Sequence, residues 1–443
     1  MIHALIVGGI IVAIALGYKT NLNTGLFGIV LAYILGAFDM GLKTSEVIGL
    51  WPTTIFFVYL SVSLFFGMAG ANGTMKKVAQ NLVYACRKTP VLIPYAIFFG
   101  AWAMAAMGVS VLGSVAFMAP IALALADQLK MDKFAASLCV DFGVLGGADF
   151  ITGGNGLVFM SLLPEVGYTD NSTTMCMTAF VVASIYFLIV FTGYMLLIKG
   201  FDPLKKSVAD LEKPEPMNRE QRTTLGLIAV LMIFALGVPI LKTATGLPFF
   251  ATLNSRIHIG LLAVVLTVVG LLMKAADQKK VFAGLPWNTI VMLCGVGMLV
   301  NLAVKAGTVQ AVGAWIGANL PAVVIPAVAS LLASFMSFFA SAGTVVCPAL
   351  FPIVPTITAA TGITDVLLIT AIIVGAQSTA ISPFSTCGST IIASCSTDED
   401  RNYLFKMFIA RAVPLLAVCS AVFFPVDLQF PTIVSFSQST DNT

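Results

Sequence analysis

The residues best suited to chemistry in this sequence lie in one stretch, GGADFITGGNG, at positions 146–156. The stretch places five glycines beside Asp149, Thr152 and Asn155, inside a long apolar run. Because each glycine costs about 1 kcal/mol relative to alanine inside a helix, this composition predicts that the helix unwinds here. Unwinding frees backbone carbonyls, which suit a cation, while freed amides and polar side chains suit an anion. We therefore expect substrate contacts from Thr152 and Asn155, and a coupling-ion site that includes Asp149, Gly153 and Gly154.

A second stretch, STAISPFSTCGST at positions 378–390, interrupts an apolar run in a similar way. It is rich in Ser and Thr, and Pro383 at its centre has no backbone N–H to donate. The alternative interpretation is that the glycines serve helix packing and the hydroxyls bond to carbonyls one turn back. The occurrence of both stretches at matching places in the chain favours unwound linkers.

Three ionisable residues lie within apolar spans, namely Asp141, Asp149 and Arg411. A charge at the centre of a membrane helix costs at least ~2.5–3.5 kcal/mol, so we expect these side chains to face the protein interior. Asp149 either coordinates a cation or carries a proton, or else it pairs with Arg411 or caps the next half-helix. We interpret Asp141 as a structural or relay group near the coupling ion. We interpret Arg411 as the partner of one aspartate, with attraction of an anionic substrate as the alternative.

The composition places these residues in a membrane. Of the 443 residues, 59% are hydrophobic and only 10% are charged, which is typical of polytopic helical membrane proteins. The basic residues lie in short loops between apolar runs, so they predict no nucleic-acid partner. The eight cysteines and two histidines form no metal-ligand pattern, so we expect neither a transition-metal site nor a cofactor. No span contains a nucleophile paired with a base, so we do not expect an enzyme.

The chain divides into two similar halves. Val91-Leu92-Ile93-Pro94 recurs 232 residues later as Val323-Val324-Ile325-Pro326, and the same displacement relates Gly143 to Gly375 and Gly156 to Gly388. Internal repeats of this kind are a signature of secondary transporters. We therefore predict a first repeat at residues 1–198, a charged cytoplasmic linker at 199–222 and a second repeat at 223–443.

Each half is expected to contain about five transmembrane helices, one of them broken, together with a charge-free hairpin. The hairpins are predicted at about 90–126 and about 320–361, and the broken helices at about 134–163 and about 365–395. The hairpin tips contain small residues and no charge, which favours re-entrant hairpins over two full crossings each. A basic surface helix is expected at 74–88, and a surface-like stretch is expected at 307–318.

An odd number of crossings per half inverts the second half relative to the first. Placing the N-terminus outside puts most of the 23 Lys and Arg residues on the cytoplasmic side. We predict a multi-pass protein of the inner (cytoplasmic) membrane with both termini outside.

With these residues assembled, the chain resembles the ion transporter superfamily, which includes the divalent anion/sodium symporters. The segments GYKTNLNTGLFGIVLAYILG, NGTMKKVAQNL and GVSVLGSVAFMAPIALALA are particularly similar to those of MatC-type dicarboxylate (malonate) carriers. In the symporters, each hairpin tip carries a Ser-Asn-Thr signature that binds substrate carboxylate and sodium. The second tip here reads Ser-Ala-Gly-Thr and the first lacks the signature. The resemblance thus implies substrate contacts from Ser110, Ser114, Ser341, Gly343 and Thr344, and from Ser382, Pro383 and Thr386 in the second linker.

The resemblance further implies an all-α elevator-type fold, a homodimer, and a moving domain made of the hairpins and broken helices. The expected function is secondary active transport of a small organic anion, a dicarboxylate first of all, coupled to Na⁺ or H⁺. The alternatives are an anion channel or uniporter, or a transporter for a monocarboxylate or another small anion.

Overall fold

The computed structural model describes residues 2–422, apart from 21, 170, 206–212, 239–240, 242–244, 246, 339 and 396. Throughout these residues the chain is all-α, without a strand. Six helices are long and apolar enough to cross a membrane, and a seventh arises if the bent pair Thr308–Asn319 and Ala322–Ser337 counts as one. The predicted all-α membrane class is confirmed, whereas five crossings per half remains a prediction. The predicted outside position of the C-terminus concerns residues 423–443, which lie outside the described part.

The first half of the chain forms the helices α1 (Ile2–Thr20), α2 (Thr24–Tyr33), α3 (Thr44–Ile48), α4 (Thr53–Ala71), α5 (Thr74–Ala85), α6 (Ile93–Ala106), α7 (Val111–Leu129), α8 (Lys133–Ala148), α9 (Gly154–Glu165) and α10 (Ser172–Leu197). A π-helical turn, η1 (Ile34–Asp39), extends α2, and a 3-10 turn, η2 (Pro90–Leu92), precedes α6. The short helix α11 (Phe201–Lys205) begins the connection to the second half.

The second half begins with α12 (Arg219–Met232), η3 (Ile233–Gly237), α14 (Pro248–Arg256), α15 (Ile259–Leu272), α16 (Gln278–Ala283), α17 (Trp287–Lys305), α18 (Thr308–Asn319), η4 (Ala322–Val324) and α19 (Ile325–Ser337). It continues with η5 (Ala342–Val346), α20 (Cys347–Leu350), η6 (Phe351–Ile353), α21 (Val354–Thr361), α22 (Asp365–Ser378), α23 (Thr386–Ala393), α24 (Asp398–Met407), η7 (Phe408–Ala412) and α25 (Val413–Val422).

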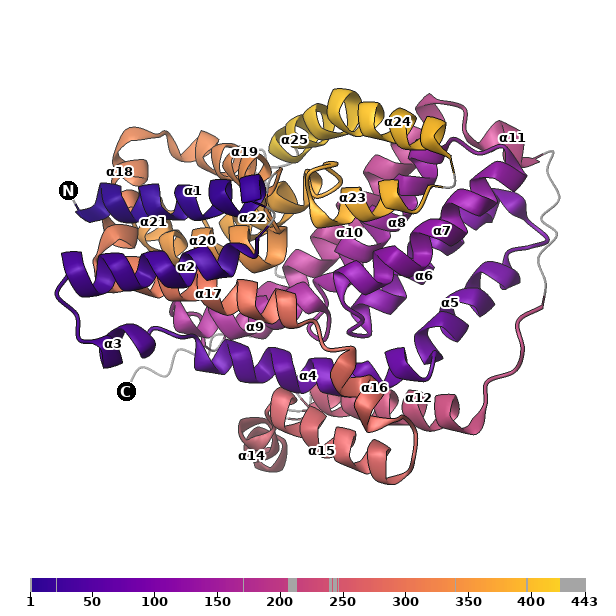
Figure 1. Ribbon diagram of the computed structural model, residues 1–443, viewed down its shortest axis with the longest axis horizontal. Helices are drawn as coiled ribbons and strands as arrows, with labels where there is room; N and C mark the ends of the chain where they lie inside the picture. The colour runs from indigo at the N-terminus through magenta and orange to yellow at the C-terminus, as the bar shows by residue number, and fades with distance from the viewer. Residues whose placement is uncertain are drawn as a thin grey trace.

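Elements of the two halves pack against each other along the whole molecule. At one end of the long axis, α1 and α2 of the first half lie beside α17 and α18 of the second (Figure 1). Likewise, α4 of the first half packs against α15 of the second. The halves are therefore interleaved and do not form two separate lobes.

The segment predicted as the first hairpin consists of α6 and α7, which meet at residues 107–110. Gly108 adopts a positive φ of 81° at the turn, and the Ser110 hydroxyl caps α7 by accepting the Gly113 N–H at 3.1 Å. The helix α7 then runs unbroken to Leu129, despite Pro120 inside it.

The segment predicted as the second hairpin is more irregular. Pro348, Pro352 and Pro355 each lack a backbone donor, and the limb after residue 341 is divided into η5, α20, η6 and α21. Its first limb, α19, is a continuous helix.

Two helices stop in the middle of the molecule and resume a few residues later. The helix α8 is buried from Phe134 to Ala148, ends there, and is followed by α9 from Gly154. The helix α22 ends at Ser378 and is followed by α23 from Thr386. Residues 149–153 form linker 1 and residues 379–385 form linker 2.

Candidate functional site

Asp149 begins linker 1 as the residue that caps α8, and its side chain is fully buried. Its Oδ1 atom accepts two hydrogen bonds, from Asn155 Nδ2 at 3.2 Å and from Gln377 Nε2 at 2.5 Å. Within the described residues, Oδ2 of the same carboxyl group has no hydrogen-bond partner. A buried carboxyl oxygen without a partner is costly, because it has lost its water. One oxygen of Asp149 is therefore held by amides, and the other is buried without a partner among the described residues.

Gln377 comes from the second half of the chain, at the end of α22, and is also fully buried. Its amide nitrogen binds Asp149, and its Oε1 atom has no partner among the described residues. Sequence reasoning missed this residue. The available signal was an amide side chain in the otherwise mainly apolar run DVLLITAIIVGAQS, directly before the break.

The tip of the second hairpin reaches linker 1. Gly343 lies so close to Asn155 that a Cβ atom built at this glycine would overlap the Asn155 amide oxygen. The neighbouring Thr344 is buried, and its Oγ1 has no partner in the part of the chain described. Ser341 precedes η5 and is half-buried, without a side-chain capping bond. Three unpartnered oxygens, on Asp149, Gln377 and Thr344, thus belong to three elements that gather around Asn155.

The tip of the first hairpin approaches the same place from another direction. A Cβ atom at Gly154 would lie 4.0 Å from Val111 Cγ2 and 3.5 Å from the Tyr59 hydroxyl. Ser110 serves as the cap of α7, whereas Ser114, one turn further on, is fully buried and has no described partner for its hydroxyl. The start of α9 at Gly154 and Asn155 therefore contacts both tips.

Thr152 and Gly153 have structural contacts within linker 1. The Thr152 hydroxyl donates to the Ala106 carbonyl at 2.5 Å, which connects the linker to the end of α6. Gly153 caps α9, and its carbonyl accepts the Leu157 N–H at 3.0 Å.

Linker 2 satisfies most of its own polar groups. The Thr379 hydroxyl donates to the Ser334 carbonyl at 2.6 Å, and Ser382 Oγ accepts the Phe384 N–H at 3.2 Å. The Ser385 hydroxyl donates to the Ala380 carbonyl and caps α23. Pro383 is buried in the linker, whereas Thr386 is exposed at the start of α23. Ser382 and Pro383 thus lie in linker 2 as predicted, without an unpartnered side-chain oxygen.

The predicted pairing of Arg411 with an aspartate is wrong. Arg411 is exposed in η7, whereas Asp141 and Asp149 are fully buried, and no ion pair joins it to either residue. Both carboxyl oxygens of Asp141 lack partners within the described residues. Arg411 lies in the middle of the candidate span Asp398–Ala421 but on an exposed face of it, so an apolar neighbourhood in sequence does not imply burial.

Linker 1, α22 and the tip of the second hairpin thus bring polar groups together beside Asn155. Asp149, Gln377 and Thr344 supply carboxyl, amide and hydroxyl oxygens, which are ligands suited to a hard cation. Ser114 and the first-turn amides of α9 are groups suited to an anion. Among the described residues, no group of three or more His, Cys, Asp or Glu side chains is placed so that it could hold a metal ion.

Comparison with known proteins gives a consistent result. Residues 1–148 match the family model described as the N-terminus of dicarboxylate carrier protein MatC. The match extends to the last residue of α8 and includes the whole first hairpin. The resemblance to MatC-type carriers predicted from the sequence is confirmed.

The fold is also similar to that of a solved transporter, YdaH from Alcanivorax borkumensis. The two structures superpose with a TM-score of 0.61 at 17% sequence identity, over 85% of this chain and 86% of the other. No curated protein matches the sequence. The chain has several helices long and apolar enough to cross a membrane, and both its matched family and its similar fold are those of transport proteins and not of enzymes.

Proposed function

We propose that this chain is a secondary active transporter that carries a small organic anion, specifically a dicarboxylate, across the inner membrane. The transport is coupled to Na⁺ or H⁺ and proceeds by an elevator motion. The dicarboxylate comes from the description of the family that matches residues 1–148. The proposed coupling to Na⁺ or H⁺ is inferred from the buried polar groups beside Asn155.

The observation that carries the proposal is the set of unpartnered oxygens around Asn155. Asp149 Oδ2, Gln377 Oε1 and Thr344 Oγ1 are all buried and come from linker 1, α22 and the second hairpin. Leaving each of them unsatisfied costs about 1–3 kcal/mol, so a bound cation or proton would relieve several such costs together. Because the three elements come from both halves, a ligand bound here would tie the halves together.

The same place offers groups for the anion. The N-terminus of α9 lies beside both hairpin tips, and helix N-termini favour negative charge. Ser110, Ser114 and Ser341 lie at those tips. A cation next to a dicarboxylate would also reduce the charge that has to cross the membrane, which links the two binding events.

The proposed repeats are supported by element bounds and by contacts. The turns η2 (Pro90–Leu92) and η4 (Ala322–Val324) are displaced by 232 residues, and Gly143 packs on the Phe98 carbonyl as Gly375 packs on that of Ser330. The two residues of the first contact, Gly143 and Phe98, thus lie 232 positions before the two residues of the second. The same displacement relates the Lys130 and Gly362 caps, both with positive φ.

The elevator motion is supported by the way the hairpins pack. The first hairpin contacts α23 of the second half through α7, and the second hairpin contacts α9 of the first half through η5 and α20. The hairpins and broken helices thus form one packed unit, while α2 with α17 and α4 with α15 form the proposed scaffold. The homodimer and the outside location of the N-terminus remain part of the proposal.

Uptake into proteoliposomes tests the function. Labelled malonate and a labelled monocarboxylate are offered with a Na⁺ gradient and a pH gradient applied separately. We expect accumulation of the dicarboxylate above equilibrium with one gradient, and saturable counterflow. Flux that neither saturates nor responds to either gradient would identify a channel or uniporter and reject the proposal.

A further inference from the structure

Two clusters of polar side chains outside the central site join different elements, which are equivalent in the proposed repeats. We call the cluster of Asp127, Lys133 and Asp400 the inner strap, and the cluster of Tyr168, Thr358 and Asp365 the outer strap, after the proposed topology. Neither cluster is used in the transport chemistry described above.

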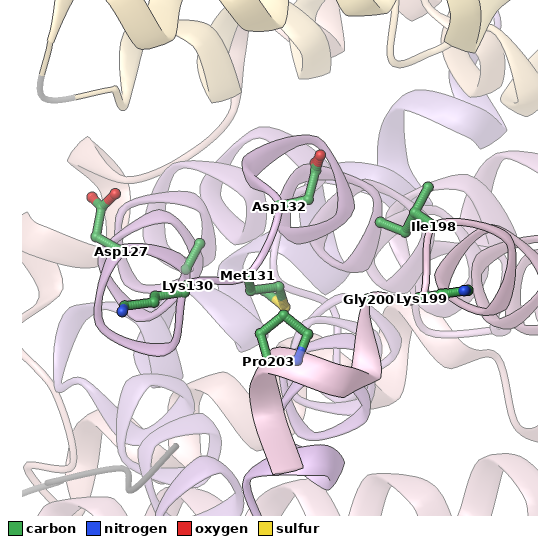
Figure 2. Close-up of a pocket in the computed structure, with 9 residues that line it drawn as sticks. Asp127, Lys130, Met131, Asp132, Ile198, Lys199, Gly200 and Pro203 are labelled. Carbon is green, nitrogen blue, oxygen red and sulfur yellow. The ribbon is translucent and has the colours of Figure 1, made fainter. Parts of the chain in front are cut away.

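The inner strap is ionic. Lys133 Nζ, at the start of α8, lies 2.6 Å from Asp400 Oδ2 in α24 and 2.7 Å from Asp127 Oδ1 at the end of α7. The Lys133 and Asp400 side chains are only 20% and 18% exposed, so this pair is better shielded than an ordinary surface pair. A cavity of about 440 Å³ adjoins it, but the labelled side chains around that cavity point in different directions, so we assign it no ligand (Figure 2).

The outer strap is a hydrogen-bonded carboxylate. Asp365 Oδ1, at the start of α22, accepts from the Tyr168 hydroxyl at 2.6 Å and from the Thr358 hydroxyl at 2.5 Å. Tyr168 follows α9, and Thr358 lies in α21 at the end of the second hairpin. The two donors therefore connect a broken helix of one half to the hairpin of the other.

The two straps occupy equivalent places in the proposed repeats. The displacement of 232 residues relates Lys133 to Asp365 and Tyr168 to Asp400. The contact between Lys133 and Asp400 therefore recurs as the contact between Asp365 and Tyr168, with different residue types at both positions. The two halves therefore share the place of the contact but not its chemistry, because one contact is an ion pair and the other is a hydrogen bond from a phenol to a carboxylate.

Each strap joins the far ends of two elements whose near ends meet at the site. The helix α9 and the second limb of the second hairpin contact each other at Asn155 and Gly343, then at Phe159 and Phe351, whose rings are 5.4 Å apart. The outer strap then closes the far end of this pair. The helices α7 and α23 also pack together, and the inner strap joins the end of α7 to α24, the helix that follows α23.

We propose that Asp365 and Lys133 are positioning residues for transport, which fix each hairpin tip relative to the opposing broken helix. This inference rests on the proposed function. The outer strap sets the place of Thr344 and Gly343 against Asn155, and hence the affinity for the cation. The inner strap sets the place of Ser114 against α23, and hence the affinity for the anion.

The test measures thermal stabilisation of the purified protein by NaCl, by lowered pH and by malonate, each titrated separately. We expect Tyr168→Phe and Asp365→Ala to weaken the cation response about three- to tenfold and the malonate response little. Lys133→Ala is expected to do the reverse, and Asp365→Asn, which keeps an acceptor for both hydroxyls, is expected to behave nearly as the wild type.

A swap gives the decisive comparison. The double variant Tyr168→Asp with Asp365→Lys places the residue types of the inner strap at the outer positions. We expect Tyr168→Asp alone and Asp365→Lys alone to weaken the cation response, and the double variant to regain it. A double variant no better than the single ones, or equal shifts in both ligand responses for both straps, would overturn the inference. A wild-type protein that responds to no ligand would instead reject the proposed function.

Discussion

The two linkers occupy equivalent places in the two halves but differ in chemistry. Linker 1 contains Asp149, which has one oxygen bound by two amides and one oxygen unpartnered within the described residues. Linker 2 contains hydroxyl groups and a proline, and its hydroxyls bond to backbone groups of the linker or of α19. Linker 1 thus has a buried acceptor without a hydrogen-bond partner among the described residues, whereas the hydroxyls of linker 2 have backbone partners.

Under the proposed duplication, this difference shows how two equivalent linkers can support an asymmetric site. Unwinding alone frees backbone groups in both halves, so it accounts for what they share. The Asp149 carboxylate accounts for what they do not share, because linker 2 contains no acidic residue. Under the proposed function, the cation binds at linker 1 with oxygens from α22 and the second hairpin.

The sharpest way to break the comparison is to remove the charge from linker 1. We expect Asp149→Asn to abolish ion-driven accumulation, with a loss of about a hundredfold or more, because a missing buried charge partner costs ~3–5 kcal/mol. Exchange of labelled malonate is expected to persist in part, since the asparagine still offers Oδ1 to Asn155 and Gln377. The measurement is gradient-driven uptake in proteoliposomes.

Asp39→Asn is the matched control, because Asp39 is an exposed carboxylate far in sequence from the linker. Its uptake should equal that of the wild type. Normal accumulation by Asp149→Asn at equal protein content would show that the two linkers do not differ in the way proposed.

Much of linker 1 could be predicted from local sequence, because glycine and aspartate in an apolar run have direct physical consequences. The break after residue 148 follows from the glycines of this stretch. The proximity of Asn155 to Asp149 follows from their separation of only six residues. Gln377 could not be predicted in the same way, because its partner lies 228 residues away and the contact depends on how the halves interleave. The role of Arg411 was misjudged because hydropathy gives the depth of a residue but not the helix face on which it lies.

The second prediction tests the contribution that α22 makes to linker 1. We expect Gln377→Leu to weaken cation dependence about tenfold, because a hydrogen bond to a charged group contributes ~1.5–3 kcal/mol and the Oε1 ligand is lost as well. A leucine should be tolerated, since Leu145 occupies the equivalent place in the first half. The measurement is the cation concentration for half-maximal malonate uptake.

Thr370→Val is the control for this change. Thr370 is buried in the same helix, and its hydroxyl bonds only to the Val366 carbonyl one turn back, at 2.6 Å. Equal shifts in the two variants would mean that α22 tolerates polar losses poorly and that Gln377 has no special role.

The smallest effect is expected in linker 2. Ser382→Ala removes an acceptor for the Phe384 N–H, so the free energy of unfolding should fall by about 1 kcal/mol. Its uptake constants should change less than about twofold, because within the described residues that hydroxyl is already used inside the linker. The resemblance to the symporters implies the opposite, namely that Ser382 contacts substrate. A tenfold rise in the malonate KM with unchanged stability would favour the role implied by the resemblance, and the two linkers would then be functionally alike. A loss of stability with a normal KM would instead leave substrate recognition to the hairpin tips and the start of α9.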